Sequence, residues 1–306
     1  MLYPLIKIAV RLALTIFCRK IKITNRQLLK TPGPLLITAN HPNSFLDATI
    51  IGALFERPVH YLARGDAFNK PWHSLLLRML NMIPVYRLSE GKENLSLNEG
   101  AFQRSKEILA ANGIVLIFIE GICVQKHELQ TFKKGAARIA LDSKKKVGLQ
   151  ILPLGIAYNS FDRFGKTIHI NIGEPLQVGL FFLFEEEAKN IREFNTVLHT
   201  EIEKSIDIPC GDTTIGIKKI LIWLPGITGY ALHLPLYSAV RKFIKMKTKG
   251  TVFFDSVLFG ALLLLYPLYL LLMVFLLWLI HIPIVLIGII LIIHPLTAWC
   301  AVRWKA

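Results

Sequence analysis

The stretch Asn40-His41-Pro42-Asn43-Ser44-Phe45-Leu46-Asp47 decides how the rest of the chain is interpreted. It follows an apolar run at 34–39 that is typical of a buried strand, and an apolar run at 48–55 predicts the start of a helix. We therefore expect His41 at a strand-to-helix turn, with Asp47 in the first helical turn. A histidine placed there can offer one ring nitrogen to a substrate while the carboxylate holds the other, as an oriented general base requires.

A second interpretation of this stretch needs no chemistry. Ser44 and Asp47 also have the spacing of a capping box, in which Asp47 would only satisfy the amino end of the helix. The stretch by itself leaves both interpretations open.

The composition favours a membrane partner over nucleic acid. The 306 residues are 53% hydrophobic with a net charge of +15, and the mean hydropathy is +0.47. A basic chain can meet nucleic acid or an anionic membrane surface, but the apolar excess favours the membrane and the sequence has no nucleic-acid-binding motif. The four cysteines form no CxxC pair, which argues against a disulfide framework or a zinc site and suits a reducing compartment.

The middle of the chain alternates strand-like and helix-like segments. This alternation predicts an α/β domain with a mostly parallel sheet flanked by helices. The predicted strands cover 35–39, 59–63, 114–119, 149–155 and 167–172, and the predicted helices cover 47–55, 73–80, 98–112, 134–143 and 185–206.

The amino-terminal segment 4–18 predicts an amphipathic helix in the membrane interface. Lys7, Arg11, Thr15 and Arg19 recur every four residues and form one polar stripe. We expect this stripe to face anionic lipid. A signal peptide would need basic residues before its apolar core and a small-residue cleavage site, and neither is evident.

The last third of the chain predicts a transmembrane helical hairpin. Residues 256–302 are 47 residues without Asp, Glu, Lys or Arg, and one spanning helix needs roughly 20 residues. We expect the turn at His281-Ile282-Pro283. Basic residues flank both ends of the run, so both flanks are expected on the cytoplasmic side. Residues 220–240 are apolar but interrupted by proline and glycine, and they predict a membrane-surface or re-entrant segment, with a third span as the alternative.

These features divide the chain into three predicted parts. They are a membrane-interface helix at 1–24, an α/β domain at 25–215, and a membrane-associated and transmembrane region at 216–306. The protein is expected to be integral to the cell membrane, with the α/β domain on the cytoplasmic side. The sequence does not determine the oligomeric state.

Three further segments of the α/β part carry candidate binding residues. Cations near a helix start suit anionic oxygens, and a glycine lets a ligand approach the backbone. Each segment alone also fits an ordinary surface feature. They are Ile83-Pro84-Val85-Tyr86-Arg87, Ile117-Phe118-Ile119-Glu120-Gly121 and Phe132-Lys133-Lys134-Gly135-Ala136.

Taken in order, these segments resemble the motif blocks of the glycerolipid acyltransferase family, the PlsC-type lysophosphatidic acid and glycerol-3-phosphate acyltransferases. His41 and Asp47 resemble the family's His-x4-Asp block, with five intervening residues here, a spacing also found in some members. The three further segments resemble its later blocks, and Ile151-Leu152-Pro153-Leu154-Gly155 resembles its fourth. Two departures stand out: Ile119 replaces the usual proline, and Ile122-Cys123 replaces a pair that often includes arginine.

The resemblance implies acyl transfer from an acyl thioester, acyl-CoA or acyl carrier protein, to a lipid hydroxyl. His41 would take the hydroxyl proton and Asp47 would hold the ring. The implied substrate-binding residues are Arg87, Glu120, Gly121, Lys133, Lys134 and Gly135, with the cations available for a phosphate. No metal or bound cofactor is implied, and Cys123 is expected to be a packed residue rather than a nucleophile.

The expected acceptor is lysophosphatidic acid (1-acylglycerol 3-phosphate), in phospholipid synthesis. Glycerol 3-phosphate and a lyso-aminolipid are the second and third choices. A membrane-bound hydrolase with His41 as the base is a competing interpretation, but it leaves the other motifs unexplained. A non-catalytic membrane protein is another, although the apolar run has no Asp, Glu, Lys or Arg and only two histidines, His281 and His294, which argues against an ion pathway.

Overall fold

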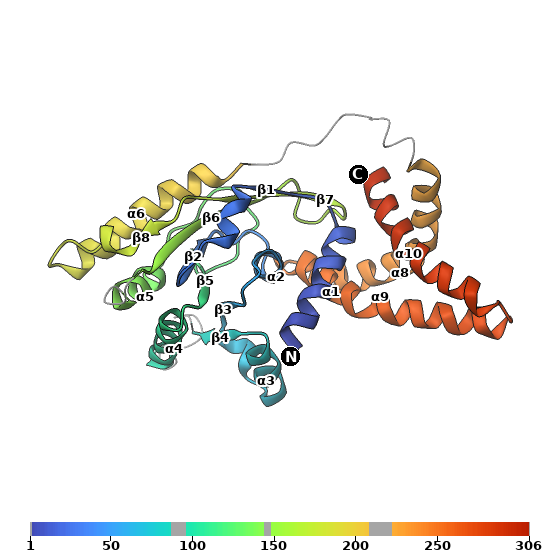
Figure 1. The fold of residues 1–306 in the computed structure, drawn as a ribbon, viewed down its shortest axis with the longest axis horizontal. Helices are drawn as coiled ribbons and strands as arrows, with labels where there is room; N and C mark the ends of the chain where they lie inside the picture. Colours follow the sequence, from blue (N-terminus) through green and yellow to red (C-terminus); the bar gives the residue numbers. More distant parts are fainter. Residues whose placement is uncertain (1, 87–95, 144–147, 208–221, 306) are drawn as a thin grey trace.

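The centre of the molecule is one eight-stranded sheet (Figure 1), seen in a computed structural model that describes residues 2–86, 96–143, 148–207 and 222–305. The strand order is β1-β7-β6-β2-β5-β3-β4, and β8 also pairs with β6. Neighbouring strands are parallel except where β6 meets β7 and β8. The predicted mostly parallel sheet is confirmed. The strands are β1 Cys18–Thr24, β2 Leu35–Ala39, β3 Val59–Arg64, β4 Met82–Val85, β5 Ile114–Phe118, β6 Gln150–Tyr158, β7 Lys166–Ile172 and β8 Leu176–Gln177.

Helices cover both faces of this sheet. Side chains alternate between the two faces of a strand, so β5 sends Ile114 and Leu116 into a core shared with α1, α2 and α9. Its other face sends Val115 and Ile117 into a second core, formed with α4, α5 and α6. The helices are α1 Leu2–Phe17, α2 Phe45–Leu54, α3 Pro71–Met79, α4 Asn98–Ala110, α5 Gly135–Ser143, α6 Glu187–Ser205, α8 Trp223–Lys247, α9 Phe254–Leu279 and α10 Ile284–Lys305.

Strands β1, β4 and β8 were not predicted from the sequence. β1 lies at the edge of the sheet and holds three cations among its seven residues, so it lacks the apolar signal of the central strands. It pairs in parallel with β7. The predicted interface segment 1–24 is therefore a helix only as far as Phe17, and Cys18–Thr24 belong to the sheet.

The polar stripe of α1 bonds the end of α2. Lys7 donates to the backbone oxygens of Phe55 and Glu56, and the Arg11 Nε donates to the Ala53 oxygen at 2.6 Å. These carbonyls lie at the carboxyl end of α2, which is favourable for cations. The prediction that Lys7 and Arg11 face anionic lipid stays a prediction. Leu5, Ile8 and Leu12 are also exposed on α1.

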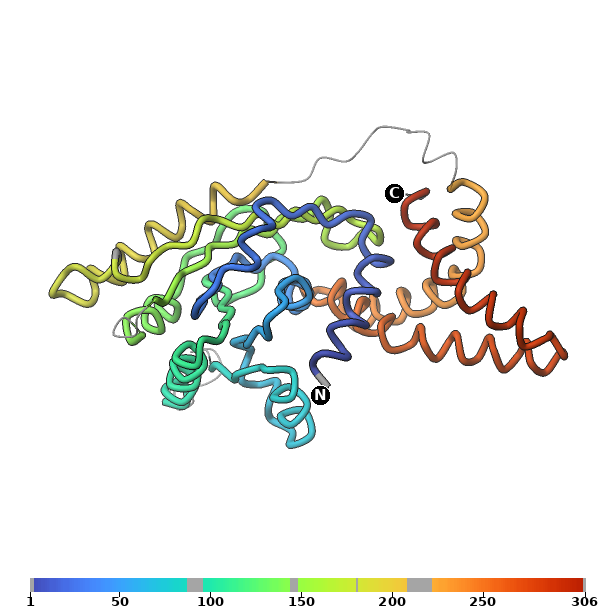
Figure 2. The backbone as a smooth tube through the Cα atoms, viewed as in Figure 1, coloured from blue at the N-terminus to red at the C-terminus, as the bar shows by residue number. Residues whose placement is uncertain are grey.

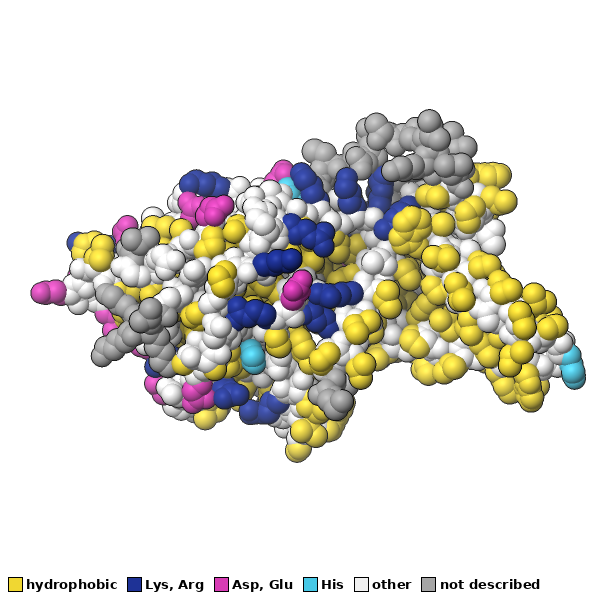
Figure 3. Space-filling model, in the orientation of Figure 1, with side chains coloured by type: hydrophobic (Ala, Val, Ile, Leu, Met, Phe, Trp, Pro, Cys, Tyr) yellow, Lys and Arg dark blue, Asp and Glu magenta, His cyan; other side chains and the backbone are white. Residues whose placement is uncertain are grey.

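The three C-terminal helices lie together on one side of the α/β domain, with α1 beside them (Figure 2). Within the described residues, α9 and α10 are the helices that are long and apolar enough to cross a membrane. They meet at the predicted turn, with α9 ending at Leu279 and α10 beginning at Ile284. On the face shown in Figure 3, hydrophobic side chains cover this part of the molecule. The predicted hairpin is confirmed as a pair of apolar helices.

The described part of the segment 220–240 is helical despite its prolines and glycines, and its placement at the membrane surface stays a prediction. Its described part belongs to one helix, α8, which continues through Pro235 and packs along α10. Gly226 and Gly229 face α10, and a Cβ at Gly229 would collide with the backbone of Thr297. The glycines therefore permit close helix packing here rather than a break in the helix.

Candidate active site

The carboxyl ends of neighbouring parallel strands bring the candidate residues together. Ala39, the last residue of β2, pairs with Phe118 of β5 on one side and with Leu154 of β6 on the other. His41 is the second residue after β2, and Glu120 is the second residue after β5. Sites of open α/β sheets lie at this edge. The residues from two separate sequence motifs thus meet because their strands are adjacent and parallel.

His41 and Asp47 form a hydrogen-bonded pair. The distance between His41 Nδ1 and Asp47 Oδ2 is 2.9 Å, and the Asp47 side chain is fully buried while that of His41 is 14% exposed. The imidazole also stacks on the Phe118 ring, with ring centroids 3.8 Å apart. Because Nδ1 is held by the carboxylate, Nε2 is the nitrogen that can exchange a proton with a substrate.

Two further donors hold the Asp47 carboxylate in place. The Asn43 backbone N–H donates to Oδ2 at 2.7 Å, and the Tyr158 hydroxyl donates to Oδ1 at 2.6 Å. Burial, followed by the nearby Asp47 charge, raises the pKa of Tyr158 well above its usual value, so this phenol stays protonated and remains a donor. The carboxylate is thereby fixed as an acceptor for an imidazolium.

The capping box that the sequence also allowed is not formed. Ser44 makes no side-chain cap hydrogen bond, and its backbone N–H donates to Cys123 Sγ at 3.0 Å. Asp47 bonds the amide of Asn43 rather than that of Ser44. Ser44 has φ 52°, a conformation that costs free energy for a residue with a side chain and that clusters at functional sites. The turn is therefore shaped to bring His41 to Asp47.

Glu120 lies buried beside this pair. Burial raises the pKa of its carboxyl group to about 7, the Asp47 charge adds to the rise, and the backbone amides of Gln130 and His41 oppose it by hydrogen bonding. Its carboxyl group thus joins the His41 turn to the loop that follows β5. The His41 carbonyl also accepts the N–H of Val124, at 3.3 Å, from the same loop.

The structure describes all of the predicted anion-binding residues except Arg87. Gly121 has φ +66°, and a Cβ there would meet the side-chain stem of Lys133, so glycine permits this close approach. Lys133 and Lys134 are exposed and directly precede α5, which begins at Gly135. The structure therefore places both lysines next to the Glu120 loop. Arg87 lies outside the described residues, and its predicted role stays a prediction.

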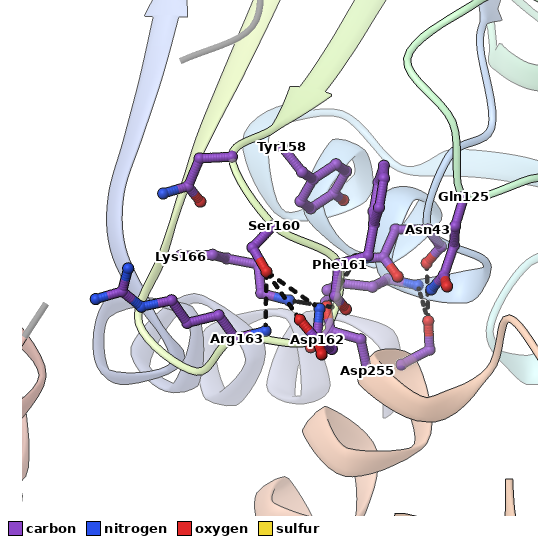
Figure 4. A network of polar contacts seen from close by, with 12 residues as sticks. Asn43, Gln125, Tyr158, Ser160, Phe161, Asp162, Arg163, Lys166 and Asp255 are labelled. Atoms are coloured by element: carbon purple, nitrogen blue, oxygen red, sulfur yellow. Dashed lines mark hydrogen bonds and ion pairs between the residues drawn. The ribbon is translucent and has the colours of Figure 1, made fainter. Parts of the chain in front are cut away.

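The first turn of α9 is hydrogen-bonded to the turn that carries His41. The Asn43 side chain donates to Asp255 Oδ2 at 2.6 Å, and the fully buried Lys166 donates to the same oxygen (Figure 4). Ser256 Oγ donates to the Asn43 carbonyl at 2.8 Å and accepts the Leu46 N–H at 3.1 Å. The candidate membrane hairpin is therefore hydrogen-bonded directly to the turn that carries the His41–Asp47 pair, which we call the dyad.

Several of these supporting residues were not predicted from the sequence. Asn40 extends β2 by exchanging two side-chain hydrogen bonds with the backbone of Ile156, at 2.8 and 2.9 Å. Tyr158 ends an apolar strand and carried no motif signal. Asp255 did offer a signal, because it is the acid that directly precedes the 47-residue uncharged run. An acid at the start of an apolar helix suggests a role at that helix end.

The family comparison agrees with the motif order. The family model described as Acyltransferase matches residues 20–157. Among solved structures, the crystal structure of the 1-acyl-sn-glycerophosphate (LPA) acyltransferase, PlsC, from Thermotoga maritima is similar at 18% sequence identity, with a TM-score of 0.45, over 63% of this chain and 74% of that one. No curated protein matches the chain. Residues 20–157 therefore match an acyltransferase domain, and their ordered motifs, which resemble those of the glycerolipid acyltransferases, meet at one edge of the sheet.

Proposed function

We propose that this protein is an integral membrane O-acyltransferase that moves a fatty acyl group from acyl-CoA or acyl carrier protein to the hydroxyl of 1-acylglycerol 3-phosphate, in phospholipid synthesis. The observation that carries the proposal is the His41–Asp47 pair, with a buried carboxylate held by two further donors and a partly exposed imidazole. Such a pair suits a general base acting on a hydroxyl.

The proposed reaction needs no enzyme nucleophile, because a thioester is already activated. His41 Nε2 takes the proton from the acceptor hydroxyl as its oxygen attacks the thioester carbonyl carbon. Asp47 stabilises the imidazolium that forms. The tetrahedral intermediate then expels the thiolate, the imidazolium returns the proton to sulfur, and the ester and the free thiol leave. Cys123 accepts a backbone N–H from Ser44 and has no part in these steps.

Lys133, Lys134 and the amino end of α5 support a phosphate-bearing acceptor. Two exposed ammonium groups precede a helix whose free N–H groups favour anions. The variant Lys134→Gln should raise KM for 1-acylglycerol 3-phosphate about tenfold, because one charge-assisted hydrogen bond is lost, and leave KM for a phosphate-free lyso-aminolipid nearly unchanged. Equal changes on both acceptors would exclude phosphate binding by Lys134. Arg138→Gln, one turn further into α5, is the matched control.

The apolar hairpin supports an integral protein with its catalytic domain in the cytoplasm. We propose that α9 and α10 span the membrane and that the turn at His281 reaches the other side. A cysteine at His281 should then react with a membrane-impermeant thiol reagent added outside intact cells, and a cysteine at Lys249 should react only after lysis. Reaction at Lys249 in intact cells would refute this topology.

The decisive experiment is a donor-by-acceptor assay on purified membranes with the native protein and His41→Ala. The native protein should acylate 1-acylglycerol 3-phosphate, and the variant should lose at least about 10²–10⁴-fold in kcat while it stays folded and membrane-bound. Near-native turnover by the variant would rule out His41 as the base. Faster turnover of glycerol 3-phosphate or a lyso-aminolipid by the native protein would change the acceptor but not the reaction class.

A further inference from the structure

A large apolar cavity lies between the helical region and the α/β domain, away from the dyad. Its volume is about 1400 Å³, and α1, α8, α9, α10 and the loop between β6 and β7 line it. Small-molecule sites typically measure roughly 300–1,000 Å³. Neither His41 nor Asp47 lines the cavity. Its size and position therefore suit hydrocarbon chains rather than a soluble metabolite.

The mouth of this cavity is basic. Arg241 and Lys245 lie one turn apart on the same face of α8, Lys249 lies in the turn after this helix, and Arg163 lines the cavity from the β6–β7 loop. Figure 4 shows the Arg163 side chain extending away from the Asn43–Asp255 pair. Lys242 adds a fifth cation, and Asp162 is the one acid among the lining residues that the structure describes.

The cations at the mouth are available to a ligand. Among the described residues, Arg163, Lys245 and Lys249 form no ion pair with an Asp or Glu side chain. The three side chains are exposed. Arg241 packs over the Phe254 ring, 6.0 Å from its centroid, and shares a side-chain hydrogen bond with Tyr237 of the same lining. Like charges gathered beside apolar walls repel one another, and an anion among them relieves this repulsion.

We propose that the cavity binds one anionic phospholipid as a non-catalytic ligand. Its acyl chains lie between α1, α8, α9 and α10, against residues such as Leu12, Phe259, Leu263 and Leu296. Its phosphate lies at Arg241, Lys245 and Arg163, where charge-assisted hydrogen bonds hold it. This arrangement matches a lipid in the cytoplasmic leaflet, whose headgroup lies at the basic flank and whose chains lie beside the apolar helices.

Such a lipid would touch the helix that braces the catalytic turn. α9 lines the cavity from Phe259 onward, and its first turn carries Asp255 and Ser256. Phe259 also packs edge-on against Phe17 at the end of α1, with ring centroids 5.1 Å apart. Filling the cavity would therefore fix α9 and α1 against the domain. The binding itself does not depend on the proposed acyl transfer.

The test measures retention of phosphatidylglycerol by the purified protein in neutral detergent, with native mass spectrometry and a titration against phosphatidylcholine. One phosphatidylglycerol per chain should remain bound, at least tenfold more tightly than phosphatidylcholine. Arg241→Gln with Lys245→Gln should weaken this binding at least tenfold. The control pair Arg192→Gln with Lys247→Gln removes the same charge outside the cavity and should have little effect. Equal weakening by both pairs would show general surface attraction and overturn the proposal.

A second variant tests the apolar part of the site. Ala9 is exposed on α1 and lines the cavity, so Ala9→Trp should exclude the acyl chains and abolish retention. Ile8→Trp, on the neighbouring exposed position outside the lining, should not. Retention in Ala9→Trp would refute the cavity as the site.

The lipid test can be separated from the proposed acyl transfer. His41→Ala should still retain the lipid, so lipid binding can be measured even if the protein transfers no acyl group. If the Arg241 and Lys245 variants change KM for the acyl acceptor but not phosphatidylglycerol retention, the cavity is a substrate path and the proposal is wrong.

Discussion

Two clusters of histidine and tyrosine lie in different surroundings. At the edge of the sheet, His41 is paired with the buried Asp47, which Tyr158 supports. In the helical region, Tyr266 bonds His233 at 3.1 Å and His294 at 3.0 Å, and His233 Nδ1 bonds the Gly229 carbonyl. The first cluster contains a carboxylate and has a partly exposed imidazole.

The helical cluster lacks such a carboxylate among its described residues, and both ring nitrogens of its His233 are already hydrogen-bonded, to the Gly229 carbonyl and to Tyr266. Its described members include no Asp or Glu, and His294 Nε2 is buried with no hydrogen-bond partner among the described residues. An imidazolium there would have no counter-ion, whereas Asp47 stabilises one at His41. The difference teaches what a histidine needs to act as a base. One ring nitrogen must be bonded to a fixed carboxylate, and the other must be free to meet the substrate. The helical cluster instead joins α8, α9 and α10.

The largest effect should come from removing the carboxylate charge. Asp47→Asn keeps the size of the side chain but offers a donor or a neutral acceptor to His41, so the tautomer and the imidazolium both lose support. We expect kcat to fall about 10³–10⁴-fold, measured with saturating acceptor. A variant that loses thermal stability but keeps kcat would mean that Asp47 has only a structural role.

The next effect concerns stability and pH. The pKa of Glu120 is raised to about 7, above its unfolded value, so the folded state holds the proton more tightly. Stability from this group is present below the unfolded pKa and is lost as pH rises toward 7. Glu120→Gln keeps a carbonyl acceptor but does not titrate. Between pH 5 and pH 8 the free energy of unfolding should therefore fall less for this variant than for the native protein, by on the order of 3 kcal/mol, as measured by thermal unfolding in detergent. Parallel pH curves for the two proteins would contradict this.

A smaller effect should come from the brace in α9. Ser256→Ala removes two hydrogen bonds to the His41 turn, at the Asn43 carbonyl and the Leu46 amide. We expect kcat to fall about tenfold with little change in KM, since the base is displaced while the acceptor site is intact. Ser238→Ala, which removes a local bond to Pro235 in α8, is the control. A rise in KM alone would show that α9 does not position the dyad.

The smallest effect should come from the helical cluster. His294→Phe preserves an aromatic ring and removes the hydrogen bond to Tyr266. We expect kcat to stay within about threefold of the native value, because this histidine has no carboxylate partner among the described residues. A loss of activity similar to that of His41→Ala, in a folded protein, would mean that the two clusters do not differ as described.

The sequence by itself determined the strands and helices that carry the His41–Asp47 pair, and the motif order that resembles the glycerolipid acyltransferases. The central strands are continuous apolar runs because both of their faces are buried, and that signal is local. The same holds for α9 and α10, whose apolar length is visible without a structure. His41 and Asp47 lie on one turn, so their pairing could also be predicted from six residues of separation.

Only the tertiary structure decided which distant residues support that pair. Asn43 and Asp255 are 212 residues apart, and Asp47 and Tyr158 are 111 apart. Their contacts depend on strand order and on the docking of α9, which no local pattern encodes. The stripe of α1 shows the same limit. Its periodicity predicted a polar side at Lys7 and Arg11 but not that this side would meet the end of α2, because helical periodicity identifies a face and not what covers it.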